Sequence, residues 1–259
     1  MNRRLGQSGA GDGPFKIGVA QIASLMGDIK GNVDMHAAAM NAAATFGASV
    51  LVFPELSLTG YEPELAASLA MSLTDPRLAP LADLARRHRI DTVLGAPLSA
   101  GFEKPSLGAI VITRDGARMS YRKIHLGAEE QAYFSMGQNP LVLDLSDHSI
   151  GIAICADSSQ PAHPKAYAAL GVDIYATSVF LNEEWYQEDA PRLAGYARRF
   201  GMLTLMANHG ASTGRFASVG RSAIWSPDGA LLAQASGIES VLIVAGTVDG
   251  VWSAETQAL

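Results

Sequence analysis

The stretch GIAICADSS, residues 151–159, contains the only cysteine of the chain at the end of an apolar run and places an aspartate two positions later. The longer run HSIGIAIC, residues 148–155, has the length and composition of a buried strand. A lone cysteine at the end of such a strand is either a small core residue or a nucleophile. The rest of the sequence has to distinguish these two roles.

Apolar runs separated by turn residues predict further strands on both sides of this stretch. The runs are FKIGVAQI (15–22), SVLVFPE (49–55), DTVLGAP (91–97), VDIYATSV (172–179), LTLMANHG (203–210) and VLIVAGTV (241–248). Two hairpins are predicted as well, with their turns at residues 115–116 and 228–229, each an Asp followed by a Gly.

Helical periodicity occurs between several of these runs. One helix is predicted to have Asn32 as its N-cap and to end at Gly47, and a second is predicted to open at Asp75. Two more fall around residues 162–170 and 187–200. No strand leads into a GxGxxG or GxxxxGK loop, which disfavours a doubly wound nucleotide-binding fold. The pattern favours a sheet-rich α/β protein with helices outside.

The composition is typical of one globular domain. The chain has 259 residues, 48% of them hydrophobic and 17% charged, and its 25 acids against 19 Lys and Arg give a net charge of −6. Residues 15–259 are expected to form a single domain, with residues 1–14 as a disordered lead-in that lacks the features of a secretory signal. The absence of a basic excess argues against nucleic acid and membrane surfaces as partners. No apolar run approaches about 18 residues, so a cytoplasmic protein is expected.

Three chemically active side chains lie at the ends of predicted strands. Glu55 follows SVLVFP, Lys123 follows RMSYR and Cys155 follows HSIGIAI. Side chains in such positions tend to meet at one rim of a sheet, where functional sites form. A carboxylate can take the thiol proton, and a fixed ammonium can stabilise the negative charge that develops when the thiolate attacks a carbonyl or nitrile carbon. The backbone N–H of Ala156 is a candidate second donor to that charge.

Other nucleophiles and metal arrangements find less support. The six histidines show no HxxxH or HExxH spacing, so no metal site is expected, and no organic cofactor is implied. His125, two residues after Lys123, leaves a Cys–His dyad open as a rival mechanism. No GxSxG elbow is present to favour a serine nucleophile.

Five segments together resemble the nitrilase superfamily of carbon–nitrogen hydrolases, in its amidase-like branch. In the order that the family has them, the segments are IGVAQIASLMGDIKGN (17–32), LVFPELSLTGY (51–61), YRKIHLGAEEQAYFSMG (121–137), GIAICAD (151–157) and GRSAIWSPDG (220–229). The resemblance extends from about Phe15 to Val248. It implies a four-layer α-β-β-α sandwich, two facing sheets with helices outside, that pairs into homodimers or larger homo-oligomers through those helices.

The resemblance also implies residue roles. Glu55 in FPELSLTGY matches the general base, Lys123 in YRKIHL the lysine that stabilises the oxyanion, and Cys155 in ICAD the nucleophile. Glu130 in EQAYFSMG matches a second glutamate of the family, with Glu129 as its alternative, and is expected to orient the lysine and the base.

The chain departs from the family around the substrate. Ala156 follows the nucleophile where relatives commonly have Tyr or Trp, and SVFLNEEWYQ (178–187) stands where relatives often have a different segment that contains tryptophan. The side chains expected to line the substrate pocket are those of Tyr61, Phe180, Asn182 and Trp185.

The expected activity is hydrolysis of a small amide through a cysteine thioester, with release of a carboxylate and ammonia. The sequence CAD, in place of the CWE typical of nitrilases, disfavours a nitrile substrate. Two alternatives remain open. One is a nitrilase or N-carbamoyl amine hydrolase that uses the same triad, and the other is a catalytically silent dimeric scaffold that binds a metabolite.

Overall fold

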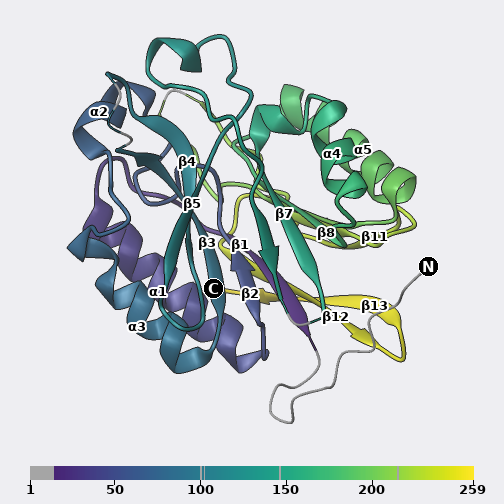
Figure 1. The fold of residues 1–259 in the computed structure, drawn as a ribbon. Coiled ribbons are helices and arrows are strands. Elements are labelled where there is room, and N and C mark those ends of the chain that lie inside the picture. Colours follow the sequence, from purple (N-terminus) through teal and green to yellow (C-terminus); the bar gives the residue numbers. More distant parts are fainter. Residues whose placement is uncertain (1–14, 100, 102, 146, 215) are drawn as a thin grey trace.

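The computed structural model describes residues 15–259 except positions 100, 102, 146 and 215. The expected lead-in at residues 1–14 lies outside the described residues. Within the described part, two β-sheets face each other and helices cover the outer face of each sheet (Figure 1). This arrangement confirms the α-β-β-α sandwich that the resemblance implies.

Neighbouring strands in each sheet are consecutive in the chain, except that the first strand of the described chain pairs antiparallel with the twelfth. In the described residues the first sheet contains, in spatial order, β13 (Val251–Ala258), β12 (Val241–Val248), β1 (Lys16–Gln21), β2 (Val50–Val52), β3 (Asp91–Leu98), β4 (Ser106–Ile112) and β5 (Arg118–Arg122). The second sheet contains β11 (Leu231–Gln234), β10 (Ala223–Trp225), β9 (Leu203–Ala207), β8 (Ile174–Ser178), β7 (Ser149–Ile154) and β6 (Val142–Asp144).

Helices form the two outer layers (Figure 1). Helices α1 (Ile29–Thr45) and α3 (Ala79–His88) pack on the first sheet, and α4 (Ala162–Ala169) and α5 (Glu183–Phe200) pack on the second. Shorter helical segments lie in the connections: η1 (Pro63–Leu65), α2 (Ala66–Leu69), η2 (Pro76–Leu78), η3 (Glu130–Ala132) and η4 (Cys155–Asp157).

Side chains between the sheets form the central core. Each strand turns alternate residues to this core, because side chains alternate along a strand. Completely buried contributors include Ile17, Val19, Val50 and Val52 from the first sheet and Ile150, Ile152, Leu203 and Leu205 from the second. The opposite faces pack on the helices, so the central strands are apolar on both sides. This double burial explains why these strands are uninterrupted apolar runs in the sequence.

Two groups of parallel strands position the site. In the first sheet β1, β2 and β3 run parallel, with Val52 of β2 paired to neighbours on both sides. In the second sheet β7, β8 and β9 run parallel, and Ile154, Ser178 and Ala207 are paired in one row at their carboxyl ends. The residues that follow these strands therefore begin at neighbouring points of the sheet edge.

The start of α1 differs from the prediction. Asp28 caps the helix, because its Oδ1 accepts a hydrogen bond of 3.0 Å from the backbone N–H of Gly31. Asn32 is fully buried inside the first turn, where its Nδ2 donates to the carbonyl oxygens of Leu25 at 2.8 Å and Leu58 at 3.0 Å. The prediction of Asn32 as N-cap was wrong because its amide fastens a neighbouring loop instead.

The structure also extends the prediction at three places. Strands β6 and β13 were not predicted, since β6 has only three residues and β13 is largely exposed and polar. Helix α5 begins at Glu183, earlier than the predicted start near residue 187. Asn182 sets this start, because its Oδ1 accepts a 2.9 Å hydrogen bond from the backbone N–H of Trp185.

Gly95 on β3 provides a test of how closely the loop after β2 packs on the sheet. A Cβ atom at this position would lie 2.3 Å from Leu56 N and 2.3 Å from Pro54 O. We therefore expect Gly95→Ala to lower the free energy of unfolding by about 1–3 kcal/mol or more, as overpacking does, in urea titrations followed by circular dichroism.

Gly195, inside α5, is the matched control. A Cβ there meets no atom within 4 Å, so Gly195→Ala should raise the stability by about 0.5–1 kcal/mol through helix propensity. Equal unfolding midpoints for Gly95→Ala and the wild type would contradict the close packing of this loop.

Candidate active site

Glu55 lies in the loop that follows β2, and its side chain is fully buried. Leu56, the next residue, has a φ of 52°, a left-handed conformation that turns the chain sharply after the glutamate. The Nε2–H of His209, which follows β9, donates to the carbonyl oxygen of Glu55 across 2.7 Å. On the other side, Leu58 N donates to the Gly95 carbonyl oxygen at 2.9 Å. Contacts from both sheets therefore hold this loop in place.

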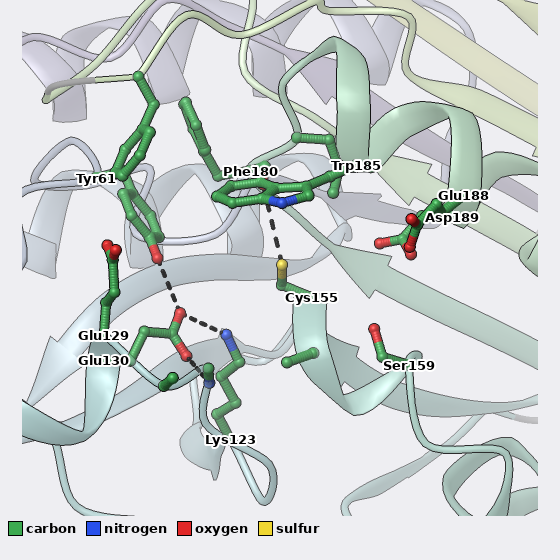
Figure 2. Close-up of a pocket in the computed structure, with 15 residues that line it drawn as sticks. Tyr61, Lys123, Glu129, Glu130, Cys155, Ser159, Phe180, Trp185, Glu188 and Asp189 are labelled. Atoms are coloured by element: carbon green, nitrogen blue, oxygen red, sulfur yellow. Dashed lines mark hydrogen bonds and ion pairs between the residues drawn. The ribbon is translucent and has the colours of Figure 1, made fainter.

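Lys123 follows β5 and is also fully buried. Its Nζ donates hydrogen bonds of 2.7 Å to Glu55 Oε1 and 2.7 Å to Glu130 Oε1. Glu130 is fixed in turn by Tyr61 OH, 2.9 Å from its Oε1, and by Gly127 N, 2.7 Å from its Oε2 (Figure 2). An ammonium carries three N–H donors, so one donor of the lysine remains for a further acceptor.

Cys155 follows β7 and is the first residue of the turn η4. Its φ of 43° lies in the left-handed region, which non-glycine residues adopt only where the surroundings enforce it. The thiol is only partly buried, and its Sγ lies 3.9 Å from the carbonyl oxygen of Phe180 (Figure 2). The sharp turn thus presents the sulfur atom at the end of the strand.

Asp157 joins this turn to the chain that leaves β5. Its Oδ2 accepts hydrogen bonds from Ile154 N at 3.0 Å and from Tyr121 OH at 2.7 Å. Its Oδ1 accepts from Ile124 N at 3.1 Å and from His125 N at 2.8 Å. One buried carboxylate therefore fixes the segment that carries the thiol relative to the segment that carries the lysine.

The geometry gives no support to a Cys–His dyad. His125 Nδ1 lies 3.1 Å from Asp157 Oδ1, and His125 is not among the described residues that line the cavity at the thiol. Behind it, His163 makes hydrogen bonds with Tyr121 OH at 3.0 Å and Tyr175 OH at 2.9 Å. His163 thus belongs to a buried network that supports the turn, and the partly exposed His125 lies at the edge of this network.

Burial and charge together set the protonation of the site. Burial raises the pKa of Glu55 to about 7, although Lys123 opposes the rise. Burial also raises the pKa of the Cys155 thiol, the Glu55 charge adds to this rise, and Lys123 opposes it. Burial lowers the pKa of Lys123, but the two adjacent carboxylates outweigh this effect and the net shift is upward. The lysine therefore stays charged, and the glutamate becomes a base that titrates near neutral pH.

One oxygen of Glu55 has no hydrogen-bond partner among the described residues. Glu55 Oε2 is buried, yet it makes no hydrogen bond with any described residue. Leaving a buried charged oxygen unsatisfied costs free energy, so such atoms are rare away from functional sites. This oxygen is therefore available to exchange a proton with the thiol or with a bound molecule.

A cavity of about 360 Å³ opens at the thiol. Around Cys155 it is lined by Lys123, Glu130 and Ala156, and its aromatic walls are formed by Tyr61, Phe180, Trp185 and Phe216. Figure 2 shows the lysine and glutamate on one side of the sulfur atom and the indole on another. The structure therefore brings together Glu55, Lys123 and Cys155, the residues that the sequence placed at strand ends.

The pocket residues predicted from the sequence divide into two groups. Tyr61, Phe180 and Trp185 line the cavity, whereas Asn182 is not among the described lining residues and instead caps α5. Ala156 lies on the cavity wall beside the thiol. Of the two neighbouring glutamates, it is Glu130 that makes the ion pair with the lysine.

Sequence reasoning missed several residues of the site. His209 follows β9 as Cys155 follows β7. The tendency of residues just after strands to meet at the edge of a sheet is therefore a signal that could have identified it. Phe216 comes from an irregular loop that carries no periodic pattern. Glu188 and Asp189 line the cavity from α5, although in sequence they have the pattern of a solvated helix face.

The described residues place no three His, Cys, Asp or Glu side chains where they can hold a metal ion together. In the same residues, no helix has both the length and the apolar character needed to cross a membrane.

Comparisons with known proteins agree on one family. The sequence profile described as carbon-nitrogen hydrolase matches residues 16–253. The chain is 31% identical over 169 residues to a glutamine-dependent NAD(+) synthetase of Thermotoga maritima, covering 62% of this chain and 29% of the synthetase. It is 30% identical over 164 residues to an (R)-stereoselective amidase of a Pseudomonas species, covering 62% of this chain and 58% of the amidase. Each match thus spans less than two thirds of the relative's length.

The structural comparison covers nearly the whole chain. An amidase from Nesterenkonia sp. AN1 superposes with a TM-score of 0.83 at 27% sequence identity, over 91% of this chain and 91% of the amidase. The structure is of a mutant of that amidase, with the acetamide moiety of fluoroacetamide added covalently at the active-site cysteine.

The role of Asp157 can be tested by Asp157→Asn. The amide keeps one acceptor oxygen but loses the charge and the second acceptor, and hydrogen bonds to charged groups are worth about 1.5–3 kcal/mol each. We expect the free energy of unfolding to fall by about 2–4 kcal/mol, measured by urea titration. Asp115→Asn, in an exposed hairpin turn, serves as control and should change the midpoint little. Unchanged stability of Asp157→Asn would show that the carboxylate does not hold the turn.

Proposed function

Because the chain belongs to the carbon–nitrogen hydrolase family, we propose that it hydrolyses a small carboxamide to a carboxylate and ammonia through a thioester on Cys155. The observation that carries the proposal is the buried Lys123 ammonium, bonded to both Glu55 and Glu130, beside a thiol that faces a cavity. The site thereby combines a nucleophile, a base that titrates near neutrality and a fixed positive charge.

In the first half of the reaction, Glu55 Oε2 takes the thiol proton while the sulfur attacks the carboxamide carbon. Oε2 suits this step because Oε1 is occupied by Lys123 and Oε2 has no partner among the described residues. The C–N bond then breaks as Glu55 returns the proton to the leaving nitrogen. Ammonia departs, and the acyl group remains on Cys155 as a thioester.

Negative charge develops on the carbonyl oxygen during the attack. The remaining N–H of Lys123 and the backbone N–H of Ala156 are the proposed donors to this oxygen. Because the ammonium is already fixed by two carboxylates, it needs no reorganisation when the charge appears. One such donor is worth about 2.7–4 kcal/mol of the barrier in enzymes where it has been removed.

In the second half, Glu55 acts as base again and activates a water molecule, which adds to the thioester carbon. The C–S bond breaks, the thiol regains a proton, and the carboxylate leaves. The proposed role of Glu130 is positioning: its Oε1 receives both Lys123 Nζ and Tyr61 OH, which holds the lysine in place.

A carboxamide is preferred over a nitrile for two reasons. The residue after the nucleophile is Ala156 within CAD, and not the tryptophan of the CWE pattern. The relatives reported above are named as an amidase and as a glutamine-dependent synthetase, and the structural neighbour is an amidase. These names point to a carboxamide as the scissile group, whereas two further relatives are named as a probable nitrilase and a nitrilase. The choice therefore depends mainly on the residue after Cys155 and on the structural neighbour.

Substitution of the thiol tests the mechanism directly. We expect Cys155→Ala to reduce ammonia release from small aliphatic amides by about 10⁴-fold or more, while the ion pairs of Lys123 keep the protein folded. The matching nitriles and N-carbamoyl amines are tested as substrates beside the amides. Release of carbon dioxide together with ammonia would identify the carbamoyl reaction. Acid quenching of the wild type during turnover should trap an acyl adduct on Cys155, measured by peptide mass spectrometry, and none on Cys155→Ala. Normal turnover by the alanine variant would exclude the thioester mechanism.

The pH profile tests the role of Glu55. Since burial raises its pKa from 4.5 to about 7, the fraction of ionised base falls as the pH drops through about 7. We therefore expect kcat/KM to decrease on the acid side with an apparent pKa near 7, approaching a tenfold loss per pH unit below that point. This acid limb of the profile belongs to the interacting groups of the site together, because Glu55, Lys123 and Cys155 influence one another's charge. A profile that stays flat down to pH 5 would rule out this carboxylate as the base, and Glu55→Gln should remove the limb along with most of the activity.

A further inference from the structure

We propose that the preferred substrates of this site carry a positively charged group, an ammonium or a guanidinium, at the end remote from the carboxamide. The inference rests on the proposed function, because it concerns the substrate of the same thiol. It is drawn from the wall of the cavity beyond the thiol, which combines carboxylates with aromatic rings.

The described residues that line the cavity carry one cationic side chain and several carboxylates. Lys123 is the cation, and two carboxylates already bond to it. Glu129, Glu188 and Asp189 add three further carboxylates to the lining. Asp189 is only 6% exposed, so its charge acts through a medium of low dielectric constant. The described lining is therefore negatively charged in sum.

Arg192 neutralises only part of this charge. Its guanidinium bonds to Asp189, donates to Ser159 Oγ at 3.1 Å and lies 3.7 Å from Glu188 Oε2. It is not among the described lining residues, and one guanidinium between two carboxylates leaves a net negative charge. The charge of Asp189 also contributes to the raised pKa of Cys155, so the field of this wall extends to the thiol.

Aromatic rings complete the wall. Trp185 and Phe216 have ring centroids 5.7 Å apart, Phe180 lies 6.0 Å from Phe216, and Tyr61 stacks on Phe180 at 4.9 Å. Trp185 is 39% exposed, so much of its indole is open to contact with a bound molecule. In the view of Figure 2 the indole lies beyond the thiol with the carboxylates of α5 beside it. Faces of aromatic rings next to carboxylates are a favourable environment for an organic cation.

Anionic substrates fit the same wall poorly. A carboxamide that also carries a carboxylate has to place that charge among Glu129, Glu188 and Asp189. The one cation of the described lining, Lys123, is held by Glu55 and Glu130 at the reactive end. Like charges brought together disfavour binding, most strongly at the buried Asp189 and less at the exposed Glu129 and Glu188, which solvent screens. The wall therefore selects by charge as well as by size.

Three amides of matched length test the inference. 6-Aminohexanamide carries an ammonium, heptanamide replaces it with a methyl group, and the monoamide of adipic acid carries a carboxylate. We expect kcat/KM to be about tenfold or more higher for 6-aminohexanamide than for heptanamide, and lowest for the adipic monoamide. The preference should weaken between about 0.02 M and 0.5 M NaCl, because salt screens partly exposed charges.

Substitutions on α5 assign the preference to the wall. Glu188→Gln should lower the ratio of kcat/KM for 6-aminohexanamide over heptanamide by about threefold or more, and Glu188→Lys should lower it further. Glu184→Gln is the matched control, because Glu184 is an exposed glutamate of the same helix that does not line the described cavity. This control should leave the ratio as in the wild type.

The outcomes separate this inference from the proposed function. Cleavage of heptanamide as fast as 6-aminohexanamide, or faster cleavage of the adipic monoamide, overturns the cationic preference and leaves the amidase proposal standing. A cationic preference that Glu184→Gln reduces as much as Glu188→Gln also overturns the role of this wall. Failure of all three amides to release ammonia, together with no acyl adduct trapped on Cys155, overturns the proposed function and this inference with it.

Discussion

The buried ammonium of Lys123 joins the loop after β2, which lies 68 residues earlier in the chain, to Glu130, which lies 7 residues later. Lys123 Nζ lies 2.7 Å from Glu55 Oε1, in the loop after β2, and 2.7 Å from Glu130 Oε1, on η3. Removing charges from water costs several kcal/mol each, and this cost is offset only while the partners remain together. Loss of one partner of a buried pair typically costs about 3–5 kcal/mol. The contact that fixes the charge at the thiol is therefore also a condition for the folding of the loops around it.

Another buried carboxylate, that of Asp157, orients the Cys155 thiol relative to this ammonium. Asp157 receives donors from the end of β7 and from the chain just after the lysine. These hydrogen bonds hold a turn in which Cys155 has a φ of 43°, a conformation that a free chain rarely adopts. Donors and charges that are held in place before the reaction stabilise a developing oxyanion better than groups that must reorient. The buried ion pairs of Lys123 and the hydrogen bonds of Asp157, which hold the strained turn, together fix the position of the Cys155 thiol relative to the ammonium.

The sequence allowed prediction of those parts of the site that depend on strand ends. Glu55, Lys123 and Cys155 each follow an apolar run, and the edge of a sheet brings such positions together whatever the details of packing. The roles of Asn32 and Asn182 depend on particular neighbours. A short amide can cap a helix or fasten a loop, and only the contacts that form in three dimensions decide which role it takes. Glu188 and its neighbour became a cavity wall because α5 packs beside the turn that carries the thiol, a relation that helical periodicity does not contain.

The charge of the cavity also bears on the direction of the reaction. The proposed hydrolysis would turn a neutral carboxamide into a carboxylate, so a negative group would form beside Glu55 and Glu130, whose bonds already use two of the three donors of Lys123. A new carboxylate in this place is repelled by its neighbours once the oxyanion has collapsed to product. The reverse reaction would require the same anion to enter a lining that is negative in its described part. For the proposed cationic substrates, the acidic lining therefore acts in opposite directions on the two ends of the product: it repels the carboxylate formed at the thiol and attracts the remote cation.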